Sequence, residues 1–481
     1  MNSSHPSPPS TAPQADPLDP GFLGDVAAGV VRLTPEQGLD LLKRAPLMTL
    51  GRYADAAARR VHGDSIRTYI IDRNINYTNV CNAKCTFCAF RRDGDESDAY
   101  TLEPEAIYEK IGELVAIGGT QILMQGGMNP ALPLDWYITL LKGIKARFPK
   151  VHVHAFSPPE FIEFVHFFDP PGSTLEEKLW WVMVRLRDAG LDSIPGGGGE
   201  IFAGPVRRKI GLGKCDADAW LTTMWVAHTL GMFTSATMMF GHIEGLADRV
   251  HHMSLVRKWQ DRALGRHQGT EASRHQVADG GYGHYKAFIA WPFQRENTPL
   301  GRVKDWGRTP AELAPGAVFP GDAVANLTGD GDPARHAEFG RRVRLSGSGD
   351  YLRTQALSRL MLDNIYSIGA SWVTMGPHIG QVALHFGAND MGSVMMEENV
   401  VSSAGTTYCL NENVLCRLIR DAGFLPAQRD NTYDVLAVHD GPTSPDLMVS
   451  DWSEHRAKKL HIEAPREKPA AAKVELTTGG R

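Results

Sequence analysis

The chain alternates short β-rich runs with longer amphipathic segments, and this alternation restricts its fold more than any other feature. Strands are predicted where β-branched and aromatic residues cluster, at 68–74, 121–124, 151–155, 193–194, 235–239, 287–290, 371–374 and 387–391. Helices are predicted where apolar residues recur every three to four positions, at 104–117, 134–148, 175–189, 217–230, 246–260, 351–366 and 412–422. The expected class is therefore α/β. Eight strands favour a (β/α)₈ barrel of the TIM type, and a doubly wound open sheet is the alternative.

The segments outside this alternation predict how the 481 residues are organised. Two further helices, at 34–43 and 49–61, precede the first strand, and the last segments follow the final strand as a C-terminal extension. The expected parts are a disordered N-terminal tail at 1–20, a helical cap at 21–66, a barrel at 67–453 with insertions near 262–283 and 302–349, and a flexible C-terminal tail at 454–481.

Composition excludes several classes of protein. The chain is 42% hydrophobic and 22% charged with a net charge of −5, which is typical of a globular protein and disfavours a nucleic-acid partner. It contains no apolar run long enough to span a membrane. Its Ser- and Pro-rich start has neither the basic nor the apolar region of a secretory signal, so a cytoplasmic, reducing location is expected.

Three of the six cysteines lie together directly after the first predicted strand. Cys81, Cys85 and Cys88 have the spacing C-x₃-C-x₂-C, which in a reducing compartment indicates metal binding and not disulfides. Structural zinc needs four ligands, and no fourth Cys or His has the usual spacing. Three thiolates favour a 4Fe–4S cluster with one iron open for another ligand. The alternatives are zinc completed by a distant His, or a non-catalytic iron–sulfur or zinc protein with a structural or sensing role.

This motif, with Phe87 before its third cysteine, resembles the radical S-adenosylmethionine (radical SAM) superfamily. Further stretches are similar to one branch of it, at 73–90, 118–130, 151–160, 190–202, 234–244, 288–300 and 386–405. That branch holds the menaquinone-pathway enzymes of the futalosine route and the related deazaflavin-synthase subunit. The resemblance covers about 33–451 and implies a barrel, a 4Fe–4S cluster, S-adenosylmethionine, a small-molecule substrate and a flavodoxin- or ferredoxin-type electron donor.

Within this branch the chain is most similar to the enzymes that cyclise dehypoxanthine futalosine. The implied reaction begins when a 5′-deoxyadenosyl radical takes hydrogen from C4′ of the substrate ribose. The carbon radical then adds to the benzoate ring, and loss of a proton and an electron restores aromaticity. Aminofutalosine synthase and the deazaflavin-synthase subunit are the alternatives within the family.

Residues that follow the predicted strands are the expected site residues, because barrel enzymes build their active sites there. The resemblance implies that the cofactors contact Phe87, Gln125, Gly126 and Gly127. Ser157 and Glu200, which lie near strand ends, are also expected to contact them. Polar residues near strand ends are expected to bind the substrate, namely Arg73, His242, Gln294, Asn297, Thr374 and Asn389. A benzoate also calls for a cation, which Arg73, Arg91 or Arg295 could supply.

The predicted catalytic residues are the three plausible acceptors of the final proton: His154, Glu200 and Asp390. Each feature also has a plainer interpretation. A histidine in a strand is often a core residue, paired glycines can be a simple turn, and a single arginine usually forms a surface ion pair.

Overall fold

The computed structural model describes residues 15–265, 282–305, 327, 342–406 and 408–455. Most of the expected N-terminal tail, of both insertions and of the C-terminal tail lies outside these residues. No helix in the described ranges is long and apolar enough to cross a bilayer.

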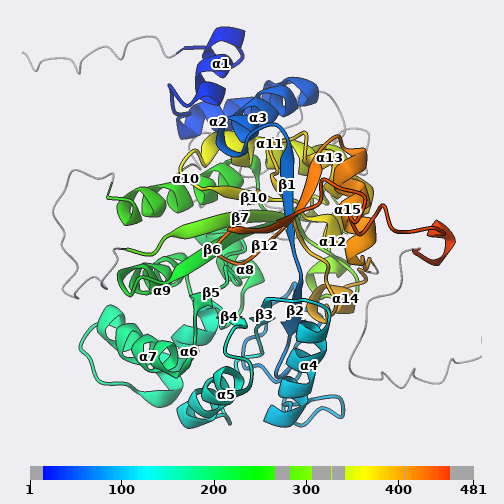
Figure 1. The fold of residues 1–481 in the computed structure, drawn as a ribbon. Coiled ribbons are helices and arrows are strands. Elements are labelled where there is room, and N and C mark those ends of the chain that lie inside the picture. Colours follow the sequence, from blue (N-terminus) through cyan, green and yellow to red (C-terminus); the bar gives the residue numbers. More distant parts are fainter. Residues whose placement is uncertain (1–14, 266–281, 306–326, 328–341, 407, 456–481) are drawn as a thin grey trace, which may run out of the picture.

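A curled sheet of eleven strands forms the centre of the molecule (Figure 1). Its strands, in spatial order, are β13 (Val435–Val438), β12 (Leu425–Arg429), β1 (Ile66–Ile70), β11 (Asp390–Ser393), β10 (Ser367–Gly369), β7 (Tyr285–Pro292), β6 (Phe233–Phe240), β5 (Ser193–Ile194), β4 (His152–Ala155), β3 (Gln121–Met124) and β2 (Asp72–Ile75). Only the pairing of β13 with β12 is antiparallel. A separate short pair joins β8 (Lys304–Asp305) to β9 (Arg342–Val343).

The sheet returns to the stretch of chain where it starts. Only Ile71 separates β1 from β2, and β1 pairs with β11 while β2 pairs with β3. With β1 and β2 counted as one strand, eight parallel strands form the ring in the described part of the chain. The α/β class and the barrel architecture are therefore confirmed, and β12 and β13 extend the sheet beyond the ring.

Helices surround the sheet (Figure 1). They are α1 (Pro20–Ala28), α2 (Pro35–Arg44), α3 (Leu47–His62), α4 (Pro104–Ala116), α5 (Leu134–Arg147), α6 (Pro158–Phe168), α7 (Leu175–Ala189), α8 (Gly204–Ile210), α9 (Ala217–Thr229), α10 (Leu246–Ala263), α11 (Ser348–Met361), α12 (Trp372–Met375), α13 (Pro377–Ala383), α14 (Val400–Ser403) and α15 (Glu412–Asp421), with 3₁₀ turns η1 (Leu300–Arg302) and η4 (Trp452–His455). Helix α2 begins where Thr34 and Gln37 cap each other's backbone, after which Pro35 fits the first turn.

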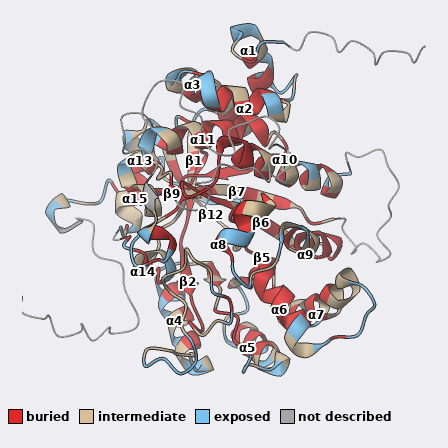
Figure 2. Cartoon of the chain, turned by 180° about the vertical axis from the view of Figure 1, so that it is seen from behind, coloured by how far each residue is buried: buried red, intermediate tan, exposed pale blue. Residues whose placement is uncertain are grey.

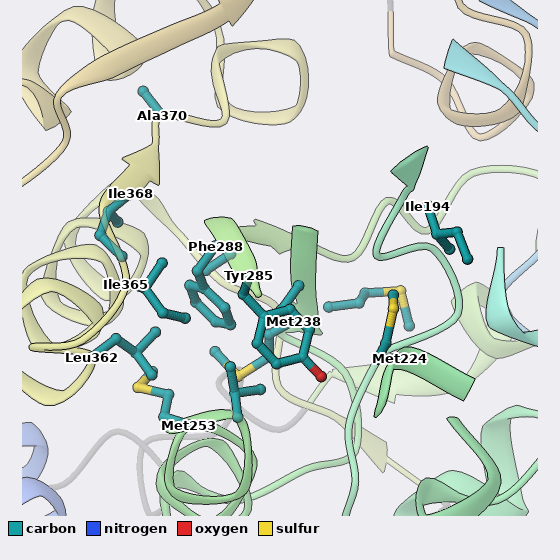
Figure 3. Packing of buried hydrophobic residues seen from close by; sticks show 14 of the residues in the cluster. Ile194, Met224, Met238, Met253, Tyr285, Phe288, Leu362, Ile365, Ile368 and Ala370 are labelled. Carbon is teal, nitrogen blue, oxygen red and sulfur yellow. The ribbon is translucent and has the colours of Figure 1, made fainter. Parts of the chain in front are cut away.

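The barrel strands are buried where they face the helices, and several residues that face the barrel interior are half-buried (Figure 2). The helices bury the side that faces the sheet. Figure 3 shows one such layer, in which Met238, Tyr285 and Phe288 of β6 and β7 pack near Met253 of α10 and Leu362 after α11. The N-terminal helices α2 and α3 pack on α10 and α11, on the outside of this layer. The fold is held by a continuous apolar layer between strands and helices.

Two expectations about the strands are wrong. The strand predicted at 371–374 is instead helix α12, and the seventh barrel strand is β10, which starts four residues earlier. The first strand, predicted as unbroken over 68–74, is divided into β1 and β2. The sequence also did not indicate β12 and β13.

Candidate active site

A cavity of about 490 Å³ occupies the inside of the barrel. Residues from every strand of the ring line it, together with the loop at 76–91 that follows β2. Thirteen of the predicted residues reach this wall: Cys81, Cys85, Phe87, Cys88, Arg91, Gln125, Gly126, Gly127, His154, Ser157, Glu200, Thr374 and Asp390. The cavity therefore brings together the cysteines and most of the expected cofactor-binding residues.

The cysteine loop is held by backbone hydrogen bonds from two directions. The N–H of Asn82 donates to Met128 O at 3.1 Å, and the N–H of Lys84 donates to Leu212 O at 2.8 Å. The three thiols are half-buried and free of disulfides. Burial raises the pKa of Cys85 to about 12 despite the nearby Lys214 ammonium, so its thiolate needs a bound cation.

Two glycines after β3 allow this loop to approach the strand ends. A Cβ on Gly127 would lie 2.0 Å from the carbonyl oxygen of Val80, and a Cβ on Gly126 would lie 2.5 Å from the Tyr77 ring. These glycines line the cavity, but the groups that need the space are the protein's own backbone and an aromatic ring.

Glu160, which the sequence analysis missed, fixes the turn at Gly126. One of its oxygens accepts from the Tyr77 hydroxyl at 2.7 Å and from the Gly126 N–H at 3.1 Å. The other accepts from the N–H and the hydroxyl of Ser157, both at 2.7 Å. The signal was present as a capping box at the start of α6, S-x-x-E. Ser157 thus lies on the cavity wall in a fixed orientation.

Glu200 and Lys214 form an ion pair on the wall beside the cysteines. The Lys214 ammonium lies 2.8 Å from Glu200 Oε1 and 5.0 Å from the centre of the Phe87 ring. Glu200 Oε2 is buried without a hydrogen-bond partner among the described residues. Glu200 also has a φ of +40°, a strained value that points to a functional position. This free oxygen can accept a hydrogen bond from a bound ligand.

His154 and Asp390 face the cavity in different states. His154 Nδ1 lies 2.6 Å from Ser193 Oγ, and burial lowers the pKa of His154 to about 3, so the ring is neutral. Asp390 is held by Arg429, with Nε–Oδ2 at 2.6 Å, and accepts from Thr68 Oγ1 at 2.5 Å. Both oxygens of the Asp390 carboxylate thus already accept hydrogen bonds from the protein, which leaves them less available to a ligand.

Five predicted substrate-binding residues do not line the cavity: Arg73, His242, Gln294, Asn297 and Asn389. Arg73 points out of the barrel, where its Nε lies 2.8 Å from Glu397. His242 is fully buried and accepts from the Ile243 N–H at 2.8 Å. Asn389 accepts from Arg359 at 2.7 Å. In the described structure these side chains contact other parts of the protein, and their role in substrate binding stays a prediction.

The remaining residues of that set, Gln294 and Asn297, lie in the loop after β7 and form hydrogen bonds with backbone carbonyls. Gln294 donates to Pro292 O at 3.0 Å, and the exposed Asn297 donates to Ser403 O at 2.9 Å. Arg295, one of the expected cations, donates to Gly301 O at 3.0 Å and also lies outside the wall. The polar residues after β7 therefore hold their own loop.

The chain is similar to known proteins in sequence. A family model of the radical SAM superfamily matches 75–256, and one of the CofH/MqnC C-terminal region matches 337–441. The cyclic dehypoxanthine futalosine synthase of Halalkalibacterium halodurans is 37% identical and covers 84% of this chain and 92% of its own. This chain belongs to the radical SAM superfamily.

Other similarities are consistent with this membership. The cyclic dehypoxanthine futalosine synthase of Streptomyces coelicolor is also 37% identical, over 87% of this chain and 90% of its own. The aminodeoxyfutalosine synthase of Thermus thermophilus is 32% identical, over 85% of this chain and 94% of its own. The solved structure of a methylornithine synthase shares the fold, with a TM-score of 0.55 and 17% identity over 84% of this chain and 97% of that one.

Membership of the radical SAM superfamily implies a 4Fe–4S cluster and S-adenosylmethionine as cofactors. The residues fit the cluster better than a single metal ion. No three His, Cys, Asp or Glu side chains of the described residues converge closely enough to hold one ion. A four-iron cluster would instead take one thiolate on each of three irons and leave the fourth open, which suits three thiols spread along one loop.

The radical SAM cavity also contains residues that the sequence analysis did not single out. Besides Glu160 and Lys214, these are Lys286 on β7 and Arg429, Asn431 and Tyr433 around the turn between β12 and β13. Asn431 donates to Ser193 Oγ at 2.9 Å inside the barrel. No short motif marks these residues, because they lie far along the chain from the strands they contact.

Proposed function

We propose that this radical SAM protein converts dehypoxanthine futalosine to cyclic dehypoxanthine futalosine in menaquinone biosynthesis. The names of two relatives, each 37% identical over most of both chains, support this assignment. The observation that carries it is one continuous cavity joining the three cysteines to the deep polar wall around His154. Such a cavity allows cofactor and substrate to meet inside the protein.

The cysteine end of the cavity is assigned to the cofactors. Cys81, Cys85 and Cys88 hold the cluster, which together with S-adenosylmethionine supplies a 5′-deoxyadenosyl radical. The free Glu200 oxygen accepts hydrogen bonds from polar groups of S-adenosylmethionine, and Lys214 fixes the orientation of that carboxylate. Phe87 adds an aromatic surface beside them.

The barrel wall orients the substrate and excludes water. Asn74 and Gln121 each present a side-chain oxygen that is buried without a partner among the described residues, and both residues line the cavity. These acceptors suit hydroxyl groups of a bound substrate. Enclosure by the barrel protects a reactive carbon radical from side reactions.

His154 is the proposed acceptor of the final proton. Its low pKa keeps the imidazole neutral at physiological pH, so the ring can accept a proton through the nitrogen that Ser193 does not contact. A weak base suffices here, because loss of this proton restores an aromatic ring. The Asp390 carboxylate is less suited, since both of its oxygens already accept hydrogen bonds from the protein.

The electron donor of this protein is proposed to be a flavodoxin or a ferredoxin.

To test the function, the anaerobically reconstituted protein is incubated with reductant, S-adenosylmethionine and dehypoxanthine futalosine. We expect 5′-deoxyadenosine and the cyclised product in equal amounts by mass spectrometry. Release of 5′-deoxyadenosine without the cyclised product would argue against this substrate and favour another reaction of the family, such as that of the aminodeoxyfutalosine synthase.

A further inference from the structure

The cations of the cavity differ in whether they have a counter-ion. In the described part of the chain four of them line the wall: Arg91, Lys214, Lys286 and Arg429. Arg91 pairs with Asp93, and the ion pairs described above neutralise Lys214 and Arg429. Among the described residues Lys286 has no carboxylate within ion-pair distance. A cation without a counter-ion inside a cavity is stabilised when an anion binds beside it.

The carboxyl groups of the cavity wall form hydrogen bonds with residues other than Lys286. Asp72 accepts from Gln121 at 2.8 Å and from Ser393, and Glu398 accepts from Asn74 at 2.8 Å. Burial raises the pKa of both carboxyl groups, which favours their neutral form. Asp72 and Glu398 therefore do not act as counter-ions of Lys286.

The position of Lys286 follows from an irregularity in the sheet. The pairing of β6 with β7 shifts between Thr234, which faces Tyr285, and Ser235, which faces Ala287. Lys286 is the extra residue of this bulge, so its side chain is released from the regular alternation. The ammonium lies 4.2 Å from the Phe233 ring centre.

The bulge puts Lys286 at the end of the cavity opposite the cysteine loop. Lys286 lies at the start of β7, whereas Trp291, which lines the same cavity, lies near its end. Five residues of strand separate them by about 17 Å. The wall between is largely apolar, with Ile289 on β7 and Ile70 on β1. The deep end thus combines the Lys286 ammonium and the Phe233 ring with polar side chains at the starts of β3 and β5, Gln121 and Ser193.

We propose that Lys286 binds the carboxylate of an aromatic acid, whose ring packs against Phe233 and the apolar wall. For the substrate, this assigns the benzoate group to the deep end of the cavity and its ribose to the side nearer the cysteines. This last step rests on the proposed function. The preference for an aromatic carboxylate rests on Lys286 and its surroundings alone.

Equilibrium binding tests the carboxylate site without any turnover. The probe is 4-fluorobenzoate, with the neutral 4-fluorobenzamide as its match, followed by ¹⁹F NMR. We expect the wild type to prefer the acid, and Lys286→Gln to weaken binding of the acid about 10- to 100-fold without affecting the amide. Lys286→Arg keeps the charge and should keep most of the preference. The exposed Lys258 on α10 provides the control Lys258→Gln, which should behave as wild type.

Equal binding of acid and amide by the wild type, or unchanged binding of the acid by Lys286→Gln, overturns the proposal. Circular dichroism checks that each variant is folded, and Lys286→Met is a second neutral variant if the Gln form is not. Steady-state cyclisation then separates this proposal from the proposed function. If the wild type cyclises dehypoxanthine futalosine, Lys286→Gln should raise KM about 10-fold or more with a smaller change in kcat. If the wild type does not cyclise it but binds the acid through Lys286, the function fails and the carboxylate site stands.

Discussion

The three thiols of the cysteine loop differ from the other cysteines in their surroundings. Cys81, Cys85 and Cys88 face the cavity, whereas Cys409 lies outside it with its thiol 3.7 Å from Met395 O. We therefore expect Cys88→Ala to lose most of the iron bound by the reconstituted wild type, together with its broad visible absorption and turnover. Cys409→Ala should retain all three. Wild-type iron content in Cys88→Ala would contradict the assignment of Cys88 as a ligand.

A second residue-scale prediction concerns His228, which is buried away from the cavity. Its ring lies 2.8 Å from Thr234 Oγ1, and burial lowers its pKa to about 3. The unfolded chain therefore binds one more proton than the folded chain between about pH 6.5 and pH 3. Over that range the free energy of unfolding falls with decreasing pH by about 1.4 kcal/mol per pH unit from this residue, and above pH 6.5 the effect is absent.

Replacing His228 should remove this dependence. In urea unfolding between pH 6.5 and pH 5, His228→Gln should show a slope shallower than wild type by about 1.4 kcal/mol per pH unit, and from pH 7.5 to pH 6.5 the two slopes should agree. The matched control is His166→Gln, since the His166 side chain is 63% exposed and should leave the slope unchanged. Parallel curves for wild type and His228→Gln would contradict the inference that His228 is neutral when folded.

At the scale of elements, the turn after β3 and the cysteine loop depend on each other. In Gly127→Ala the new Cβ would overlap the Val80 carbonyl, so the loop must move. We expect a loss of about 1–3 kcal/mol in stability and reduced iron binding, measured by thermal unfolding and iron analysis. Gly112→Ala on α4 is the control, because its Cβ would meet only Phe148 at 4.0 Å and should stabilise the helix by about 0.5–1 kcal/mol. Normal iron content in Gly127→Ala would show that the loop tolerates the displacement.

Elements with strong periodicity could be predicted from the sequence, and short elements held by tertiary contacts could not. Helix α7 and strand β3 have the predicted bounds. Trp372 and its neighbours have high β-propensity but form α12, because Trp372 packs in the apolar core and the strand ends before it. The extension β12–β13 has an exposed outer strand without the apolar pattern of a buried one.

The site was predictable where chemistry depends on a local motif. The cysteines were found by their spacing and the Gly126 turn by the family resemblance, but several residues on the barrel strands were not assigned to the correct face. All four residues of β2 are buried, so hydrophobicity does not distinguish Asp72 and Asn74, which line the cavity, from Arg73, which points away. Lys286 and Arg429 were missed because a bulge and a long-range strand pairing put them in the cavity.

At the scale of the whole molecule, the C-terminal extension is joined to the barrel through a buried ion pair. Arg429 ends β12 and binds Asp390 of β11 through two hydrogen bonds, at 2.6 and 2.9 Å, with the side chains 6% and 2% exposed. Since Asp390 also accepts from Thr68 on β1, the pair connects the ring to the added strands. The extension should therefore unfold together with the barrel and not as a separate unit.

Removing one partner tests this coupling. Arg429→Met leaves the Asp390 carboxylate buried without its counter-charge, which is expected to cost about 3–5 kcal/mol of stability. A thermal melt should show one transition at a lower Tm, with fluorescence and circular dichroism changing together. The control Arg187→Met removes an exposed pair with Asp188 and should change stability by about 0.5 kcal/mol or less. If Arg429→Met instead showed an early separate transition with the main Tm unchanged, the extension would be an independent unit, and its residues could not form a fixed part of the cavity wall.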